Sequence, residues 1–140
     1  MAEKRALIVD DDYANRSIWE LVLTDRGYDV VSASDLTEGA TSVSGDISLY
    51  LIDYHLPDGR GTDIVKQVKQ EFPDSLIFMV SMDDDADVIR EAMYSGGNVF
   101  IVKPASPAMM NQLLNEIETG EVDQRTRQLI NRNGRRTYAG

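Results

Sequence analysis

Three consecutive aspartates, Asp10-Asp11-Asp12, directly follow a short apolar run at residues 6–9. Carboxylates that lie so close at the end of a buried strand raise one another's proton affinity or recruit a cation. Hard divalent cations such as Mg²⁺ prefer oxygen ligands and need few carboxylates from the protein. Capping of a following helix would account for Asp12 but leaves Asp10 and Asp11 without a role. The pattern therefore predicts a metal site at this strand end.

Three further polar residues end later apolar runs: Asp53, Ser81 and Lys103. A carboxylate held beside a divalent cation can attack a phosphoryl group and form an acyl phosphate. A hydroxyl and an ammonium near the phosphoryl oxygens would complete such a site. Taken singly, Asp53 is typical of a turn, Ser81 of a helix cap and Lys103 of the surface. Their joint placement at strand ends favours phosphoryl chemistry.

Five short apolar segments rich in β-branched or aromatic residues have the character of buried strands. These segments are Leu7–Val9, Tyr28–Ala33, Ile47–Ile52, Leu76–Val80 and Val99–Val102.

Helical spacing of apolar residues fills the stretches between and after these strands. The predicted apolar stripes are Ile18, Leu21 and Val22; Leu36, Ala40 and Val43; Ile64, Val65, Val68 and Phe72; Val88, Ala92 and Met93; and Met110, Leu113, Leu114 and Ile117. Gly27, Pro73 and Gly96 are expected to end the first, third and fourth helices. Ser106-Pro107 is a favourable start for the last helix.

Five strand-then-helix units with short connections predict an α/β fold, a doubly wound five-stranded parallel sheet with five flanking helices. Ligands of such sheets bind at the carboxyl ends of the strands. The aspartates, Asp53, Ser81 and Lys103 should therefore meet at one edge.

The composition fits one globular domain of 140 residues, with 42% hydrophobic and 27% charged residues. The absence of cysteine excludes disulfides and thiolate metal sites. The apolar run before the aspartates is too short for a signal peptide or a membrane span, so we expect a cytoplasmic protein without membrane contact.

The net charge of −10 is unevenly distributed. Residues 1–118 contain 22 acidic and 9 basic side chains, a net −13, whereas residues 119–140 contain 2 acidic and 5 basic ones, a net +3. A body this acidic should not bind nucleic acid directly. Residues 119–140 are expected to be a basic C-terminal tail or linker, flexible or docked on an acidic surface, with a short helical extension at 122–130 as one alternative.

Four motifs resemble the receiver domain of bacterial response regulators, the chemotaxis-regulator-like family with a flavodoxin-like fold. They occur in the family's order and cover residues 4 to about 118: Leu7-Ile8-Val9-Asp10-Asp11-Asp12, Asp53-Tyr54-His55-Leu56-Pro57-Asp58-Gly59-Arg60-Gly61, Met79-Val80-Ser81, and Phe100-Ile101-Val102-Lys103-Pro104. The resemblance predicts a receiver domain at residues 1–118, which functions in a phosphorelay as a switch and catalyses only its own phosphorylation and dephosphorylation.

The resemblance also implies a role for each matching residue. Asp53 would accept the phosphoryl group from a histidine kinase or a phosphotransfer protein. Mg²⁺ would be held by Asp10, Asp11, Asp53 and the backbone carbonyl of His55. Ser81 would hydrogen-bond the phosphoryl group, and Lys103 would pair with it. Ser81 and Phe100 would form the switch, and a cis peptide would join Lys103 to Pro104.

By the same resemblance, phosphorylation would switch a surface made by the fourth helix, the fifth strand and the fifth helix, approximately residues 84–118. The partner would be a downstream protein or an output domain outside this chain, and a homodimer through the same surface is an alternative. Met82 and Ala105 depart from the usual family residues. The His55 side chain is expected to face solvent.

Two other functions use the same fold class. A hydrolase of the haloacid-dehalogenase kind would use Asp10 as nucleophile and Asp12 as acid and base, but its further acidic pair is represented only by Glu116 and Glu118, on a predicted helix. A flavin-binding module would need a phosphate loop rich in Ser, Thr and Gly after the first strand, where this chain has aspartates.

Overall fold

The computed structural model describes residues 4–138 and contains the predicted parallel sheet. Its five expected strands are β1 (Lys4–Val9), β2 (Tyr28–Ala33), β3 (Leu49–Asp53), β6 (Leu76–Ser81) and β7 (Val99–Val102). All of them run parallel, in the spatial order β2-β1-β3-β6-β7. The order reverses direction at β1, so that the connections leaving the paired strands β1 and β3 go to opposite faces of the sheet, at the switch point where doubly wound sheets bind ligands.

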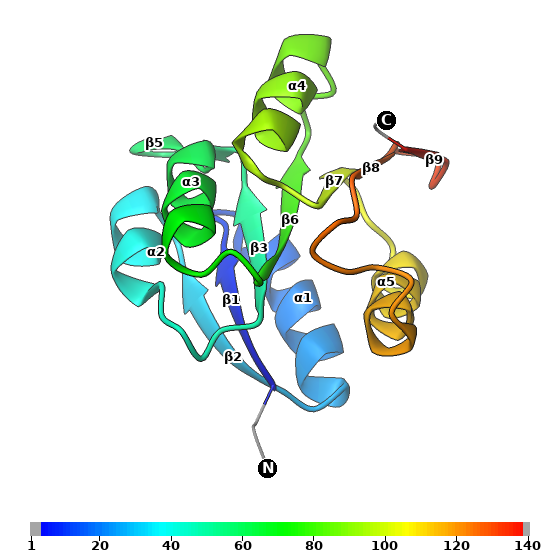
Figure 1. Ribbon diagram of the computed structural model, residues 1–140, viewed down its shortest axis with the longest axis horizontal. Coiled ribbons are helices and arrows are strands. Elements are labelled where there is room, and N and C mark those ends of the chain that lie inside the picture. The colour runs from blue at the N-terminus through cyan, green and yellow to red at the C-terminus, as the bar shows by residue number, and fades with distance from the viewer. Residues whose placement is uncertain (1–3, 139–140) are drawn as a thin grey trace.

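Five helices cover the two faces of this sheet. They are α1 (Tyr13–Asp25), α2 (Leu36–Ser42), α3 (Thr62–Glu71), α4 (Ala86–Ser95) and α5 (Pro107–Thr119). Figure 1 shows α1 and α5 on one side of the sheet and α2 and α3 on the other. Strand residues alternate between the two layers, so Ala6 and Ile8 pack with α1 and α5 whereas Leu7 and Val9 pack with α3.

The helix boundaries agree with the caps that the sequence predicts. Asp12 is the N-cap of α1, and its side chain accepts hydrogen bonds from the backbone N–H groups of Ala14 and Asn15. Ser106 caps α5, with Pro107 at its first position. Gly96 ends α4 with a positive φ of 122°. These local signals fix where each helix starts and stops.

The predicted apolar stripe of α1 is wrong by about one residue position. Leu21 is 73% exposed and Ile18 is 41% exposed, whereas Trp19 and Leu23 are buried with Val22. The large Trp19 ring fills the space against the sheet, and this packing sets the rotation of the helix.

The sheet has two strands more than predicted, because residues 119–140 are not a flexible tail over their described part. After α5, residue Val122 is buried, and β8 (Gln128–Ile130) pairs in parallel with β7. A turn then leads to β9 (Arg136–Tyr138), which pairs antiparallel with β8. We call residues 128–138 the C-terminal hairpin; it lies beside β7, between α4 and α5 (Figure 1).

The helical alternative for residues 122–130 is also wrong, and the physical reason lies in the pattern of the segment. Gln128 and Ile130 are buried while Leu129 between them is half-buried, which is the period of a strand and not of a helix. The Asn131 side chain accepts hydrogen bonds from the backbone N–H groups of Asn133 and Arg135 and so closes the turn.

A second, small sheet follows β3 and was not predicted. It consists of β4 (His55–Leu56) and β5 (Gly59–Arg60), paired antiparallel. Over the part of the chain that the structure describes, no helix has the length and apolar character needed to cross a bilayer.

Candidate functional site

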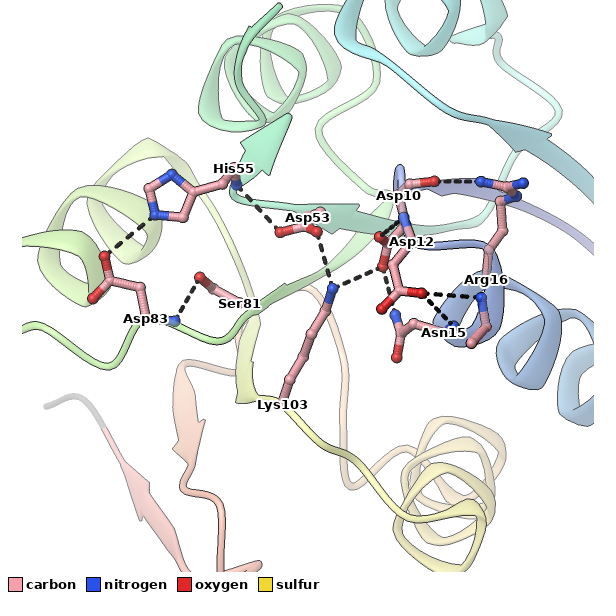
Figure 2. Close-up of polar contacts among 10 residues, drawn as sticks. Asp10, Asp12, Asn15, Arg16, Asp53, His55, Ser81, Asp83 and Lys103 are labelled. Atoms are coloured by element: carbon pink, nitrogen blue, oxygen red, sulfur yellow. Dashed lines mark hydrogen bonds and ion pairs between the residues drawn. The ribbon is translucent and has the colours of Figure 1, made fainter. Parts of the chain in front are cut away.

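The carboxyl ends of four parallel strands bring the predicted polar residues together, as Figure 2 shows. Asp10 follows β1, Asp53 is the last residue of β3, Ser81 is the last residue of β6, and Lys103 follows β7. Asp10 and Asp53 are only 1% and 6% exposed, and Ser81 is fully buried. The parallel sheet thus gathers residues separated by up to 93 positions of sequence (Asp10 to Lys103) at one edge.

The Lys103 ammonium lies between two of the carboxylates (Figure 2). Its Nζ is 3.0 Å from Oδ2 of Asp53 and 3.1 Å from Oδ2 of Asp10, and its side chain is only 10% exposed. Buried ion pairs of this kind are strongly coupled, since loss of one partner leaves an uncompensated charge. Lys103 is therefore part of the carboxylate cluster and not a surface lysine.

Asp11 completes the cluster from the exposed side. One carboxylate oxygen from each of Asp10, Asp11 and Asp53 can be chosen so that all three lie within 4.8 Å of one another. Three carboxylates and one ammonium leave two negative charges to be balanced. Oxygen-only donors at this spacing suit a hard cation such as Mg²⁺, so the residues fit the predicted metal.

Burial and neighbouring charges set the proton affinities of the site. Burial raises the pKa of Asp53, Lys103 opposes this and Asp10 adds to it, with the result that the pKa of Asp53 is raised to about 6. Burial alone would lower the pKa of Lys103, but the adjacent carboxylates of Asp53 and Asp10 outweigh it and raise that pKa above its ordinary value. The lysine therefore stays charged.

Helix α1 holds Asp10 in place through two residues that the sequence analysis did not identify. Asn15 donates from Nδ2 to Oδ2 of Asp10 at 2.5 Å, and Arg16 donates to the backbone carbonyl of Asp10 at 2.7 Å. The backbone N–H of Asp12 donates to Oδ1 of Asp10 at 2.9 Å. Only the location of Asn15 and Arg16, one helical turn after the aspartates, could have indicated this role in the sequence. Asparagine and arginine on a helix are usually exposed, so their residue types gave no indication.

The backbone of Gly61 packs directly against the backbone of Asp53. A Cβ atom at this position would lie 2.1 Å from the backbone oxygen of Asp53 and 2.7 Å from the Ile52 side chain. The backbone N–H of Gly61 also donates to the carbonyl of Tyr54 at 2.8 Å. The segment after β4 and β5 can approach β3 this closely only because the residue has no side chain.

Ser81 links the cluster to the loop before α4. Its Oγ accepts a hydrogen bond from the backbone N–H of Asp83 at 3.0 Å, and its carbonyl accepts one from the backbone N–H of Lys103 at 2.8 Å. The peptide bond between Lys103 and Pro104 is cis, as predicted. Phe100 is fully buried, one strand away from Ser81.

The His55 side chain is exposed, as expected, but it is not free. Its Nε2 lies 3.2 Å from a carboxylate oxygen of Asp83, so the pair spans the region beside Asp53 (Figure 2). The backbone N–H of His55 donates to Oδ1 of Asp53 at 3.2 Å. The acidic run at residues 83–85 leads into α4, and the Asp85 side chain caps that helix.

The geometry does not support the dehalogenase-like alternative. Both acceptor contacts of the Asp12 carboxylate go to backbone N–H groups of α1, which leaves it as a cap. Glu116 lies on α5, where it pairs with Arg136 of the C-terminal hairpin. The acidic pair that this class requires is thus not near Asp10.

Comparison with known proteins agrees with this geometry. The family model described as the response regulator receiver domain matches residues 6–115. The chain is 30% identical over 118 residues to the chemotaxis protein CheY of Thermotoga maritima, covering 81% of this chain and 97% of that protein. It is also 30% identical over 100 residues to a cyclic di-GMP phosphodiesterase of the same organism, covering 71% of this chain and 27% of that protein.

A solved structure gives the same result. The CheY-like response regulator receiver domain protein from Methanospirillum hungatei superposes with a TM-score of 0.75 at 29% identity, over 84% of this chain and 93% of that one. The chain spans about a quarter of the length of the longer curated relatives that it matches. On these findings the chain belongs to the response regulator receiver domain family, the phosphoacceptor domains of two-component signalling.

Proposed function

We propose that Asp53 is the residue that accepts the phosphoryl group. The observation that carries this assignment is the pairing of Lys103 with the Asp53 and Asp10 carboxylates, at 3.0 and 3.1 Å, beside the oxygens of Asp11. Asp53 ends a central strand, is nearly buried and has an ammonium within contact distance. A transferred phosphoryl group carries negative charge, and Lys103 is placed to neutralise it.

The transfer would proceed by in-line displacement. A carboxylate oxygen of Asp53 attacks the phosphorus of a phosphohistidine, the O–P bond forms, and the N–P bond breaks. The imidazole nitrogen leaves with the bonding electron pair and takes up a proton from solvent. Lys103 would then pair with a phosphoryl oxygen, and Ser81 would donate its hydroxyl hydrogen to another.

Asp10, Asp11, Asp53 and the backbone carbonyl of His55 would hold Mg²⁺ in this proposal. When bound, Mg²⁺ supplies charge neutralisation and alignment of the phosphoryl oxygens. Asn15 and Arg16 orient Asp10 for this role through their hydrogen bonds to it. The Asp53 side chain must be deprotonated to act as nucleophile, which its raised pKa makes dependent on pH.

The chain would act as a switch and not as a turnover enzyme. The phosphoryl donor would be a histidine kinase or a phosphotransfer protein in the cytoplasm. The response would be a change at Ser81, Phe100 and the face formed by α4, β7 and α5. The C-terminal hairpin covers the edge of β7 on that face, so a downstream partner, or a second copy of the chain, would have to bind around it or displace it.

Incubation with acetyl phosphate and Mg²⁺ tests the assignment. The expected result is one acid-stable, hydroxylamine-sensitive phosphoryl group per chain, measured by intact mass, and its loss in the Asp53→Ala variant. Multiple turnover of the donor that depends on Asp10 and survives Asp53→Ala would instead support a hydrolase.

A further inference from the structure

The C-terminal hairpin occupies the strand edge that would otherwise be open beside Phe100. Leu129 is the register partner of Phe100 across the β7–β8 pair, and it packs in the same apolar cluster as Ile89 and Met93 of α4. Ile130 packs in the opposite cluster, with Met110 of α5. One hairpin strand thus pairs with β7 and shares apolar clusters with α4 and α5, the three elements of the predicted switch surface.

Specific polar contacts hold the hairpin in this position. Asn98 is fully buried, and its carbonyl accepts a hydrogen bond from the backbone N–H of Gln128 at 3.0 Å, while its side chain donates to the carbonyls of Gln124 and Thr126, in the segment that leads into the hairpin, at 3.1 Å each. At the other end, Arg136 pairs with Glu116 of α5 at 2.5 Å. These contacts make the docked position a defined one.

The tip of the hairpin contacts the loop that leaves the phosphorylation site. Arg132 donates from Nη2 to the backbone carbonyl of Met82 at 3.1 Å, and it lies 3.8 Å from a carboxylate oxygen of Asp84. Met82 directly follows Ser81 in the chain. A shift of the backbone at Ser81 toward a phosphoryl group on Asp53 would therefore also move the carbonyl that Arg132 binds.

We propose that the C-terminal hairpin is a strap on the switch surface, whose docking is weakened when Asp53 is phosphorylated. This inference rests on the proposed function of Asp53. Two routes connect the sites: the Arg132 contact to Met82, and the Leu129 side chain packed beside Phe100. Coupling between two sites is reciprocal, so the docked hairpin also disfavours the phosphorylated state, and its release uncovers α4, β7 and α5 for a partner.

Hydrogen exchange measured by mass spectrometry tests the strap on the full chain. The states compared are Mg²⁺ alone and Mg²⁺ with beryllofluoride, an analogue of the phosphoryl group, for the native chain and for Asp53→Asn. We expect exchange in residues 128–138 to become about tenfold faster with beryllofluoride in the native chain and to stay unchanged in Asp53→Asn.

The failure of each proposal gives a different result. If beryllofluoride changes exchange neither at residues 81–83 nor in the hairpin, Asp53 is not the acceptor and both proposals are wrong. If the 81–83 segment responds while the hairpin keeps its protection, the strap alone is wrong.

Arg132→Ala tests the polar route, with Arg135→Ala as the matched control. Arg135 lies on the same hairpin, but among the described residues the structure gives its side chain no hydrogen bond or ion pair. We expect Arg132→Ala to bind beryllofluoride about two- to fivefold more tightly, and Arg135→Ala to bind it like the native chain. Equal affinity in both variants, together with an unchanged affinity in Leu129→Ala, would overturn the coupling.

Discussion

Lys103 and Arg132 both reach from the β7–β8 side of the molecule toward the acidic strand ends, but their surroundings differ. The Lys103 side chain is 10% exposed, and the side chains of its partners Asp10 and Asp53 are 1% and 8% exposed. Arg132 is 54% exposed and lies 3.8 Å from a carboxylate that is 67% exposed. Exposed ion pairs contribute about 0–1 kcal/mol, whereas removing one partner of a buried pair costs about 3–5 kcal/mol.

The comparison shows that the two regions suit different tasks. The carboxylate cluster is buried and its charges compensate one another, so its chemistry depends on each of the paired residues. The C-terminal hairpin is held at its tip by contacts that cost little to break, so it can respond to a change elsewhere. Four predictions, in order of expected effect, test this difference.

Loss of the Lys103 ammonium should have the largest effect. In Lys103→Ala, the initial rate of phosphoryl uptake from acetyl phosphate should fall by about 100- to 1,000-fold, because a charged donor to the transition state is removed. Intact-mass time courses measure the rate. Lys66→Ala, which removes an exposed lysine from α3, serves as the control and should keep the native rate. A comparable loss in both variants would contradict the role of Lys103.

The second-largest effect is expected from a methyl group added beneath Asp53, and it concerns the stability of the fold. Gly61→Ala should lower the free energy of unfolding by about 2–3 kcal/mol, because its Cβ would overlap the Asp53 carbonyl. Urea denaturation measures the change. Gly45→Ala is the control, since its Cβ would meet only the edge of the Phe72 ring, at 3.1 Å. Equal stability of Gly61→Ala and the native chain would show that the backbone around Gly61 and Asp53 can shift to accept a Cβ atom.

The charge on Asp53 should destabilise the protein at neutral pH. Its pKa is about 6 in the folded chain against an ordinary value of 3.8, so the folded state holds a proton that the unfolded state has lost between these values. Stability from this group therefore falls as pH rises from about 4 to 6, and the penalty is complete above that range. Without Mg²⁺, Asp53→Asn should gain up to about 3 kcal/mol at pH 7.5, because Lys103 keeps Asp10 as a charged partner and is not left uncompensated.

Thermal or urea unfolding of both chains at pH 7.5 and at pH 4 measures this effect. The advantage of Asp53→Asn should largely vanish at pH 4, where the native carboxyl is protonated in the fold. An equal advantage at both pH values would mean that packing, and not charge, accounts for it.

The smallest effect is expected at the turn of the C-terminal hairpin. Gly134 has a φ of 81°, so Gly134→Ala should cost about 1 kcal/mol locally. Hydrogen exchange should become faster in residues 128–138 and stay unchanged in β1 and β3. Faster exchange in β1 and β3 as well would show that the stability of the whole fold depends on the hairpin, and would contradict this prediction.

Much of the fold and of the cluster could be predicted because strand ends are encoded locally. Each of the four strands that carry Asp10, Asp53, Ser81 and Lys103 is a short apolar run, and parallel topology brings their carboxyl ends together. The hydrogen bonds of Asn15 to Asp10 could not be predicted in the same way, since they depend on side-chain conformations across a turn.

The C-terminal hairpin was missed although its turn carries a recognised signal. Asn133-Gly134, between the short runs at 128–130 and 136–138, is typical of a β-hairpin. Each run has only three residues, and three of the six side chains are polar (Gln128, Arg136 and Thr137), so the pairing depends on the open edge of β7 and not on the apolar character of the runs. The rotation of α1 was missed for a similar reason, because the size of Trp19 outweighed the spacing of Ile18 and Leu21.

The sharing of one ammonium between two carboxylates has a consequence for how the site handles an arriving anion. Lys103 can turn from one acidic neighbour to the newcomer while it keeps the other, so its charge retains an acidic partner throughout the exchange. Rotation of the Lys103 side chain is enough to exchange one partner for another, so the surrounding backbone does not need to rearrange.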